Sequence, residues 1–270
     1  MFLVEGNQPA FGCDLKKAEN LSEVVLRDGV WETILCNGSV MLSAVNKLND
    51  NKLVTLENIT PGAEDLIERA CRTCYLSFHR YDPPKSTEEL IKKILRKKHH
   101  SVLEHAHATF RIKGGSRVFT HELVRHRFIS PSQESQRYVC YADKPGRQKT
   151  KDFEFVTPPT FIGDDFDFTE KYKKQVDLCY QLYEKMLDAG IPPEDARYIL
   201  PNGTTSEIVI TANFRELRHF FWVRTNQRAH WEIRLIAIEM LKIMKREAPI
   251  VFGDFVIDEK NMSATGEIET

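Results

Sequence analysis

Residues 125–138 read Arg-His-Arg-Phe-Ile-Ser-Pro-Ser-Gln-Glu-Ser-Gln-Arg-Tyr and are the stretch that most constrains the fold. Guanidinium and imidazole groups crowd together here, and an unpaired charge buried in a low-dielectric interior costs several kcal/mol. We therefore expect this stretch to line a wet surface or a pocket for an anionic ligand. The alternative is a solvated turn whose charges pair with neighbouring carboxylates, and the residue types alone leave both open.

The segment before this motif has the pattern of a helix. Residues 116–125 follow a Gly-Gly pair, and Phe119 and Leu123 are spaced i,i+4 on a face towards the core. Pro131 disfavours helical geometry at the residue before it, so we expect the helix to end there and to expose backbone N–H groups. With the planar guanidinium forks and the serine hydroxyls, these groups would form a cradle for phosphate.

The same motif carries a resemblance to a known family. Arg125-His126-Arg127, Ser135 and Arg137-Tyr138 resemble the signature of the flavin-dependent thymidylate synthases, the ThyX family. Further motifs follow in order over residues 52–252. The resemblance implies an α+β fold with a central antiparallel sheet flanked by helices. It also implies that the motif is a wall shared by deoxyuridine monophosphate (dUMP) and the flavin.

The resemblance further implies which residues contact each ligand. The matches to flavin-binding positions are Ser101, Arg125, His126, Arg127, Gln133, Asn213, Arg215 and His219. The matches to substrate-binding positions are Glu122, Arg125, Gln133, Ser135, Arg137, Arg197 and Arg224. Arg224 is the expected catalytic residue, because a fixed cation can stabilise negative charge that develops on the pyrimidine. His99 is expected near the reacting rings.

Three positions depart from the family pattern. Glu122 stands where many members have Gln, Ser132 stands where many have Asn, and His230 follows Ala229 where Gln is frequent. The first departure puts a carboxylate near the expected uracil site.

The implied activity is reductive methylation of dUMP to thymidylate (dTMP). NADPH would reduce FAD, 5,10-methylenetetrahydrofolate would supply the carbon, and the enzyme would be a homotetramer with active sites at subunit interfaces. Two alternatives stay open: a related flavin- and folate-dependent enzyme that modifies a pyrimidine differently, and a nucleic-acid-binding protein that uses the basic segments around Arg125 and Arg224.

We expect no covalent nucleophile. Cys74 and Cys140 occur in apolar or aromatic local sequence, which suggests packing, and a reactive thiol needs an electropositive, partly exposed setting. The sequence identifies no general base for Ser135, and an unactivated hydroxyl is a weak nucleophile. Direct hydride delivery to the pyrimidine is therefore expected.

Composition and the absence of certain motifs exclude several classes of partner and site. The 270 residues carry a formal net charge of −1, so there is no general case for nucleic-acid or membrane binding. No apolar run reaches the roughly 18 residues of a spanning helix, and we expect a cytoplasmic protein with reduced thiols. No Rossmann or P-loop fingerprint is present, and His99, Glu104, His105 and His107 match no zinc spacing, so no metal is expected.

The chain divides into three expected parts. Residues 1–51 look like a β-rich extension of unknown role with turns at Asp28-Gly29 and Asn37-Gly38, residues 52–252 form the enzyme domain, and residues 253–270 are a tail. Within the domain we expect a capping box from Ser86 to Glu89, strands over 106–112, 153–156 and 207–211, and a long helix over 168–189 stopped by Gly190. Helices are also expected over residues 64–71 and 229–246. Another should begin at Asn213, with Arg215, His219 and, at its margin, Arg218 on a polar stripe.

Overall fold

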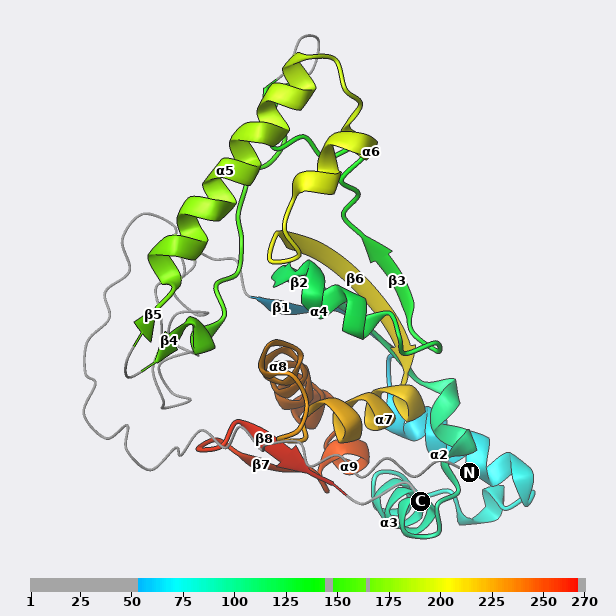
Figure 1. Ribbon diagram of the computed structural model, residues 1–270. Coiled ribbons are helices and arrows are strands. Elements are labelled where there is room, and N and C mark those ends of the chain that lie inside the picture. The colour runs from blue at the N-terminus through cyan, green and yellow to red at the C-terminus, as the bar shows by residue number, and fades with distance from the viewer. Residues whose placement is uncertain (1–52, 144–147, 164–165, 267–270) are drawn as a thin grey trace, which may run out of the picture.

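The centre of the protein is a four-stranded antiparallel sheet, seen in a computed structural model that describes residues 53–143, 148–163 and 166–266. Its strands, in spatial order, are β1 (Val54–Ile59), β2 (His107–Ser116), β6 (Thr205–Asn213) and β3 (Ser130–Gln133). Strand β6 pairs with β2 on one side and with the short edge strand β3 on the other. The predicted α+β fold with a central antiparallel sheet is confirmed (Figure 1).

Alternation along the strands turns one face of the sheet into the main core. Ala108, Phe110 and Ile112 of β2 are buried, as are the alternate residues of β6, while the side chains between them are partly exposed. The buried face is covered by α2 (Ala63–Cys74), α3 (Lys85–Arg96), α7 (Phe214–Arg224), α8 (Trp231–Glu247) and α9 (Pro249–Phe252). Burial of this apolar face is the main driving force for the fold.

A smaller layer lies on the other side of the sheet (Figure 1), built by α5 (Thr169–Asp188) and α6 (Pro193–Ala196). Tyr183 and Leu187 of α5 form a separate apolar cluster with Tyr141 and Ala196. As predicted, α5 stops before Gly190, whose φ of +84° suits a residue without a Cβ. The 3₁₀ turn η4 (Arg197–Ile199) follows α6 directly.

The remaining elements are short. They are η1 (Phe78–Arg80), η2 (His100–His105), α4 (Arg117–Leu123), η3 (Pro159–Phe161), the pair β4 (Ile162–Gly163) and β5 (Phe166–Asp167), and the pair β7 (Val256–Asp258) and β8 (Ser263–Thr265). The last pair lies in the expected tail and packs on the main core, since Ala264 is buried there and its N–H donates to Thr225 O over 3.0 Å.

Helix α4 begins as predicted but ends early. Ser116 is its N-cap and accepts a hydrogen bond from Phe119 N at 3.1 Å. The helix stops at Leu123, and Pro131 lies in the edge strand β3, where a missing N–H is tolerated. The expectation that Pro131 ends the helix and frees backbone N–H groups is therefore wrong. The N–H of Arg125 donates instead to Glu122 O, and that of His126 to Leu123 O.

Two local expectations are also wrong. Helix α3 begins at Lys85 rather than after Ser86, whose hydroxyl accepts a hydrogen bond from Asp82 N at 2.8 Å instead of capping the helix. The expected strand over 153–156 is reduced to a single bridge between Phe155 and Thr204. The other expected helices and strands in the described residues form, with ends that differ by a few residues.

The cysteines behave differently from one another. Cys71 and Cys140 are buried, as expected for packing residues, but Cys74 is exposed, so the packing interpretation is wrong for Cys74. All four cysteines of the described residues are free thiols. Cys13, Cys36 and the β-rich segment expected before residue 52 lie outside the described residues.

Two kinds of feature are absent from the described ranges. No helix there is long and apolar enough to cross a membrane. In the same ranges, no three side chains of the His, Cys, Asp and Glu types are grouped so that they could hold a metal ion.

Arg218 is buried rather than on the polar stripe of α7. Its side chain is 2% exposed, and its guanidinium donates to both carboxylate oxygens of Asp254 at 2.7 Å and also to Val251 O. The cation lies 5.0 Å from the ring centroid of Phe255. This pair ties α7 to the segment that follows α9.

Asp254→Ala should lower the free energy of unfolding by about 3 kcal/mol, because it leaves the Arg218 cation buried without its carboxylate. Urea denaturation of the two proteins measures this. Glu88→Ala is the control: it removes a pair with Lys92 whose side chains are 55% and 59% exposed, and it should cost less than about 1 kcal/mol. Equal losses in the two variants would contradict a structural role for the buried pair.

Candidate active site

The basic motif runs along the edge of strand β6. Ser130 is paired with Thr211 near the end of β6, Gln133 with Ile208, and Glu134 N donates to Glu207 O at 2.8 Å. The first residues of the motif therefore lie where α7 begins, and its last residues lie towards α6 (Figure 1). Strand pairing thus spreads one short sequence along the length of the sheet.

Near the first residues of the motif, Arg224, the last residue of α7, makes direct contacts with two other predicted site residues. Its Nε donates to His126 Nε2 at 2.9 Å, Nη1 donates to Glu122 Oε2 at 3.0 Å, and Nη2 donates to Glu122 O at 3.4 Å. The Arg224 side chain is 20% exposed, so the fork is held in place but still reaches solvent. Glu122 Oε1 also lies 3.6 Å from His230 Nδ1, which joins two of the departures from the family pattern.

His126 supports Arg224 from inside the protein. Its Nε2 accepts a hydrogen bond from Arg224 Nε, so this nitrogen carries no proton and the ring proton lies on Nδ1. His126 Nδ1 lies 3.4 Å from Glu216 Oε1, and both side chains are less than 10% exposed. The imidazole ring also meets Phe220 edge-on at 5.1 Å between centroids. Among the predicted flavin-binding residues, His126 is thus a buried support for its neighbours.

The start of α7 gathers other predicted flavin-binding residues. Asn213 is the N-cap as expected, and its Oδ1 accepts a hydrogen bond from Glu216 N at 2.8 Å. Arg215 is exposed and pairs with Glu104 Oε1 at 2.6 Å. Glu104 belongs to η2, which also carries the exposed Ser101, so this ion pair brings the two predicted stretches together.

His219 and His99 complete this end of the site. His219 is half-buried, with its ring 6.0 Å from that of His126. His99 is exposed and directly precedes η2.

The other end of the motif forms a turn after β3. Gln133 Nε2 donates to Thr120 Oγ1 at 2.9 Å and to Ser206 Oγ at 3.2 Å, which links β3 to α4 and β6. Ser135 Oγ accepts a hydrogen bond from Arg137 N at 3.3 Å. The side chains of Arg125, Arg127 and Arg137 are all exposed.

Arg197 lies apart from the α7 residues. It follows α6 on the far side of the sheet, and its Nε donates to Glu194 O at 3.1 Å. The predicted substrate and flavin residues of one chain thus fall into two groups. One surrounds α7, and the other lies towards α6.

Sequence reasoning missed three buried glutamates of this region. Glu216 could have been found, because it follows the N-cap Asn213 at the spacing of a capping box. Glu134 lies inside the motif with no pattern that marks it. Glu232 accepts hydrogen bonds from Ser116 N at 2.7 Å and Ser116 Oγ at 2.6 Å, across a sequence distance that no local pattern reports.

Glu232 has an unusual electrostatic environment. Burial raises the pKa of its carboxyl group above the usual range, although the two Ser116 hydrogen bonds oppose this shift. The contact holds the start of α4 to α8, and α4 carries Glu122 towards Arg224.

Comparison with known proteins identifies the family. Residues 55–250 match the model of the family described as thymidylate synthase complementing protein. The chain belongs to this family. A flavin-dependent thymidylate synthase of Geobacter sulfurreducens is 39% identical over 212 residues, which cover 75% of this chain and 86% of the relative. Proteins with the same name from Pyrococcus abyssi and Corynebacterium efficiens are 47% and 37% identical, over 72% and 82% of this chain and 80% and 90% of their own lengths. The resemblance inferred from the motifs is confirmed.

The free energy of unfolding of Glu232→Gln should increase relative to that of the unmodified protein as the pH rises. A carboxyl group whose pKa is higher in the folded than in the unfolded state contributes most below its unfolded value, about 4.3, and loses that contribution as the pH rises through its folded pKa. The neutral amide avoids this loss: its oxygen can accept the hydrogen bond from Ser116 N, and its NH2 group can donate to Ser116 Oγ. Urea midpoints at pH 4 and pH 7 test it, with the exposed Glu88→Gln as control. A Glu232→Gln difference that is the same at both pH values would contradict the expectation.

Proposed function

We propose that this chain methylates dUMP to dTMP, with 5,10-methylenetetrahydrofolate as carbon donor and NADPH-reduced FAD as hydride source. The observation that carries the proposal is the family match over residues 55–250. Relatives that share most of its length are named flavin-dependent thymidylate synthases. The contacts among Arg224, Glu122 and His126 support it, because they give the expected catalytic cation a defined geometry.

The start of α7 suits a flavin dinucleotide. Arg215 is about half exposed there, at the N-terminus of an 11-residue helix, and the exposed hydroxyl of Ser101 lies in the adjoining turn η2. A helix N-terminus and an arginine fork both favour phosphate oxygens. Arg215 would exchange its partner Glu104 for the pyrophosphate, while His219, Arg125 and Arg127 would bind the rest of the cofactor. When bound, the flavin supplies the redox chemistry.

The other group of residues suits the nucleotide. Arg137 and Arg197 of this group would neutralise the phosphate of dUMP together with Arg125 from the α7 end, and Ser135 would donate a hydrogen bond to it. Gln133 would contact the nucleotide with the amide group that now reaches Thr120 and Ser206. Arginine is well suited to this task because its planar fork matches the phosphate oxygens and keeps its charge at every physiological pH.

Arg224 would act on the pyrimidine. Negative charge develops there as N3 loses its proton or C5 becomes nucleophilic, and a fixed cation in a partly dry site stabilises that charge. His126 and Glu122 hold the guanidinium before substrate arrives, so little reorganisation is needed. Glu122 lowers the net charge of the site, and its carboxylate would be the group next to the uracil ring.

The environments of the three candidate nucleophiles, Cys140, Cys74 and Ser135, do not favour covalent attack. The Cys140 thiol is buried and donates to Ala142 O at 2.9 Å. Cys74 is exposed, with its thiol 3.7 Å from Ala70 O. Ser135 Oγ accepts a hydrogen bond from the N–H of Arg137, which is a donor and cannot act as a base. These environments support direct hydride delivery.

The proposal includes a homotetramer with active sites at subunit interfaces. Large apolar side chains near the predicted site are exposed in the single chain: Phe128 is 79% exposed, Tyr138 67% and Tyr198 88%. Apolar side chains that gather into one exposed patch mark a surface that another molecule covers, and the proposed interface would cover these three. A shared site would also bring the α7 group and the α6 group together from different chains.

The test is a spectrum followed by a product assay. The purified protein should show the visible absorbance of an oxidised flavin, and NADPH should bleach it without oxygen. With dUMP and methylenetetrahydrofolate it should then form dTMP. A colourless protein that binds no added flavin would refute the proposal. A yellow protein that makes a different pyrimidine product would favour the related modifying enzyme instead.

Arg137→Ala should weaken dUMP binding by about tenfold or more, because hydrogen bonds to charged groups contribute about 1.5–3 kcal/mol each. Titration of the flavin-loaded enzyme with dUMP measures this. Arg246→Ala removes an exposed arginine of α8 and should leave the dissociation constant unchanged. An unaltered affinity in a folded Arg137→Ala enzyme would remove phosphate binding from this part of the motif.

A further inference from the structure

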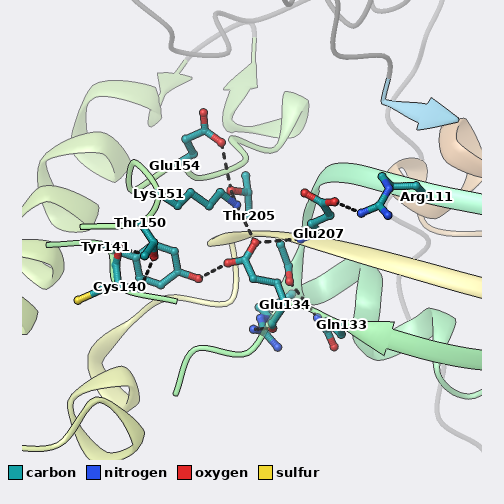
Figure 2. A network of polar contacts seen from close by, with 12 residues as sticks. Arg111, Gln133, Glu134, Cys140, Tyr141, Thr150, Lys151, Glu154, Thr205 and Glu207 are labelled. Atoms are coloured by element: carbon teal, nitrogen blue, oxygen red, sulfur yellow. Dashed lines mark hydrogen bonds and ion pairs between the residues drawn. The ribbon is translucent and has the colours of Figure 1, made fainter. Parts of the chain in front are cut away.

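Glu134 lies inside the basic motif, yet its carboxylate points away from solvent. The side chain is 8% exposed, and a buried carboxylate is costly unless donors surround it. Oε1 accepts a hydrogen bond from the Tyr141 hydroxyl at 2.6 Å. Oε2 accepts one from Lys151 Nζ at 2.9 Å and one from Glu207 N at 3.2 Å. Figure 2 shows these donors converging on Glu134 from separate segments.

The backbone of Glu134 is held as completely as its side chain. Its N–H donates to Glu207 O at 2.8 Å, and its carbonyl accepts a hydrogen bond from Arg117 Nη2 at 2.9 Å. Strand β6, helix α4 and the segment around Lys151 therefore all fix this one residue. The residue directly before it, Gln133, is bound to α4 and β6 as well.

The turn that follows is closed at its base by the same carboxylate. Ser135 O accepts hydrogen bonds from Tyr138 N at 3.0 Å and Val139 N at 2.8 Å, so residues 135–139 fold back on themselves. The contact between Tyr141 and Glu134 then joins the two ends of the loop. This loop carries Ser135 and Arg137, two of the side chains expected to bind the phosphate.

Tyr141 is in turn anchored in the aromatic cluster beneath α5. It is 1% exposed, its carbonyl accepts a hydrogen bond from Tyr180 OH at 2.9 Å, and its ring centroid lies 5.9 Å from that of Phe153. Burial, and then the contact with Glu134, raise the pKa of the Tyr141 hydroxyl far above its usual value, so it stays a donor. The cluster also contains Ala196, which directly precedes Arg197.

We propose that Glu134 is a positioning residue that holds the Ser135–Arg137 loop ready for the nucleotide phosphate, through its bonds to Tyr141, Lys151 and strand β6. The inference rests on the proposed function, since it assumes that this loop binds dUMP. A loop that occupies its binding conformation only part of the time lowers the apparent affinity by that fraction. Loss of the anchor should therefore weaken phosphate binding more than it slows the reaction.

The test uses the flavin-loaded enzyme and two ligands, dUMP and deoxyuridine, which lacks the phosphate. Tyr141→Phe removes the hydroxyl and keeps the ring. Thr87→Val is the matched control, because the buried Thr87 hydroxyl also donates to a carboxylate, Glu68 Oε2, at 2.6 Å, on the far side of the main core. Dissociation constants for both ligands and turnover at saturating dUMP are measured for each protein.

Tyr141→Phe should weaken dUMP binding about five- to tenfold, leave deoxyuridine binding unchanged, and keep saturated turnover within about twofold. Glu134→Gln should have the same effect or a larger one, because it also removes the charge partner of Lys151. Thr87→Val should keep the preference for dUMP over deoxyuridine that the unmodified enzyme shows.

Three outcomes would overturn the inference. An unchanged preference for dUMP in Tyr141→Phe would make the network a stabilising feature only. A similar loss of preference in Thr87→Val would trace the effect to general destabilisation. If the unmodified enzyme bound no dUMP, the proposed function would fail first and this inference with it. If it bound dUMP normally and Tyr141→Phe did too, the inference alone would fail.

Discussion

The hydrogen-bonded ladder of strand β6 is the constraint on which the rest of the structure depends. One edge of β6 pairs with β2 in the main sheet, and the other edge pairs with β3, the strand that carries the motif. Its last residue, Asn213, caps α7 and so directs Arg215 and Arg224 from that helix. Near its start, Glu207 holds both the backbone and the carboxylate of Glu134. A single strand therefore fixes the positions of both ends of the candidate site.

Burial of charge is the second constraint, and three buried or partly buried charges of the described residues have an oppositely charged partner. Arg218 is neutralised by Asp254, Glu134 by Lys151, and Arg224 by Glu122. Such pairs add little net stability compared with apolar packing, but breaking one is costly. Their effect is to select one arrangement of the side chains around them. In a site that must hold an arginine fork at a fixed angle, the selection of one side-chain arrangement matters more than added stability.

The sequence predicted best what is determined by near neighbours. Gly190 stops α5, Asn213 caps α7, and the apolar residues of β2 and β6 alternate, because each depends on residues a few positions away. The errors arose where a distant partner decides the outcome. Pro131 lies in a strand because β6 is there to pair with it. Ser86 is the exception, since its partner Asp82 is only four residues away.

The candidate site shows the same division. The motif pointed to the residues, through the family resemblance, but not to the contacts between them. The bonds from Arg224 to Glu122 and His126 join positions about a hundred residues apart. Glu232 and Ser116 are 116 positions apart. Only the folded sheet and the packing of α4 against α8 bring these groups within hydrogen-bonding distance, so no local pattern could have reported them.

If dUMP binds where we propose, the arrangement around Arg224 accounts for a carboxylate at position 122. A free carboxylate beside the uracil would repel developing negative charge, but the Glu122 carboxylate accepts a hydrogen bond from Arg224 Nη1 and lies close to His230. The pair is close to neutral as a unit, and His126 adds a third contact that holds Arg224 independently of Glu122. In the proposed reaction, charge that develops on the pyrimidine would compete with Glu122 for the same guanidinium. Because the fork has several N–H donors in one plane, it can bind both groups at once. The carboxylate thus sets the orientation of the cation while leaving part of its fork for the substrate.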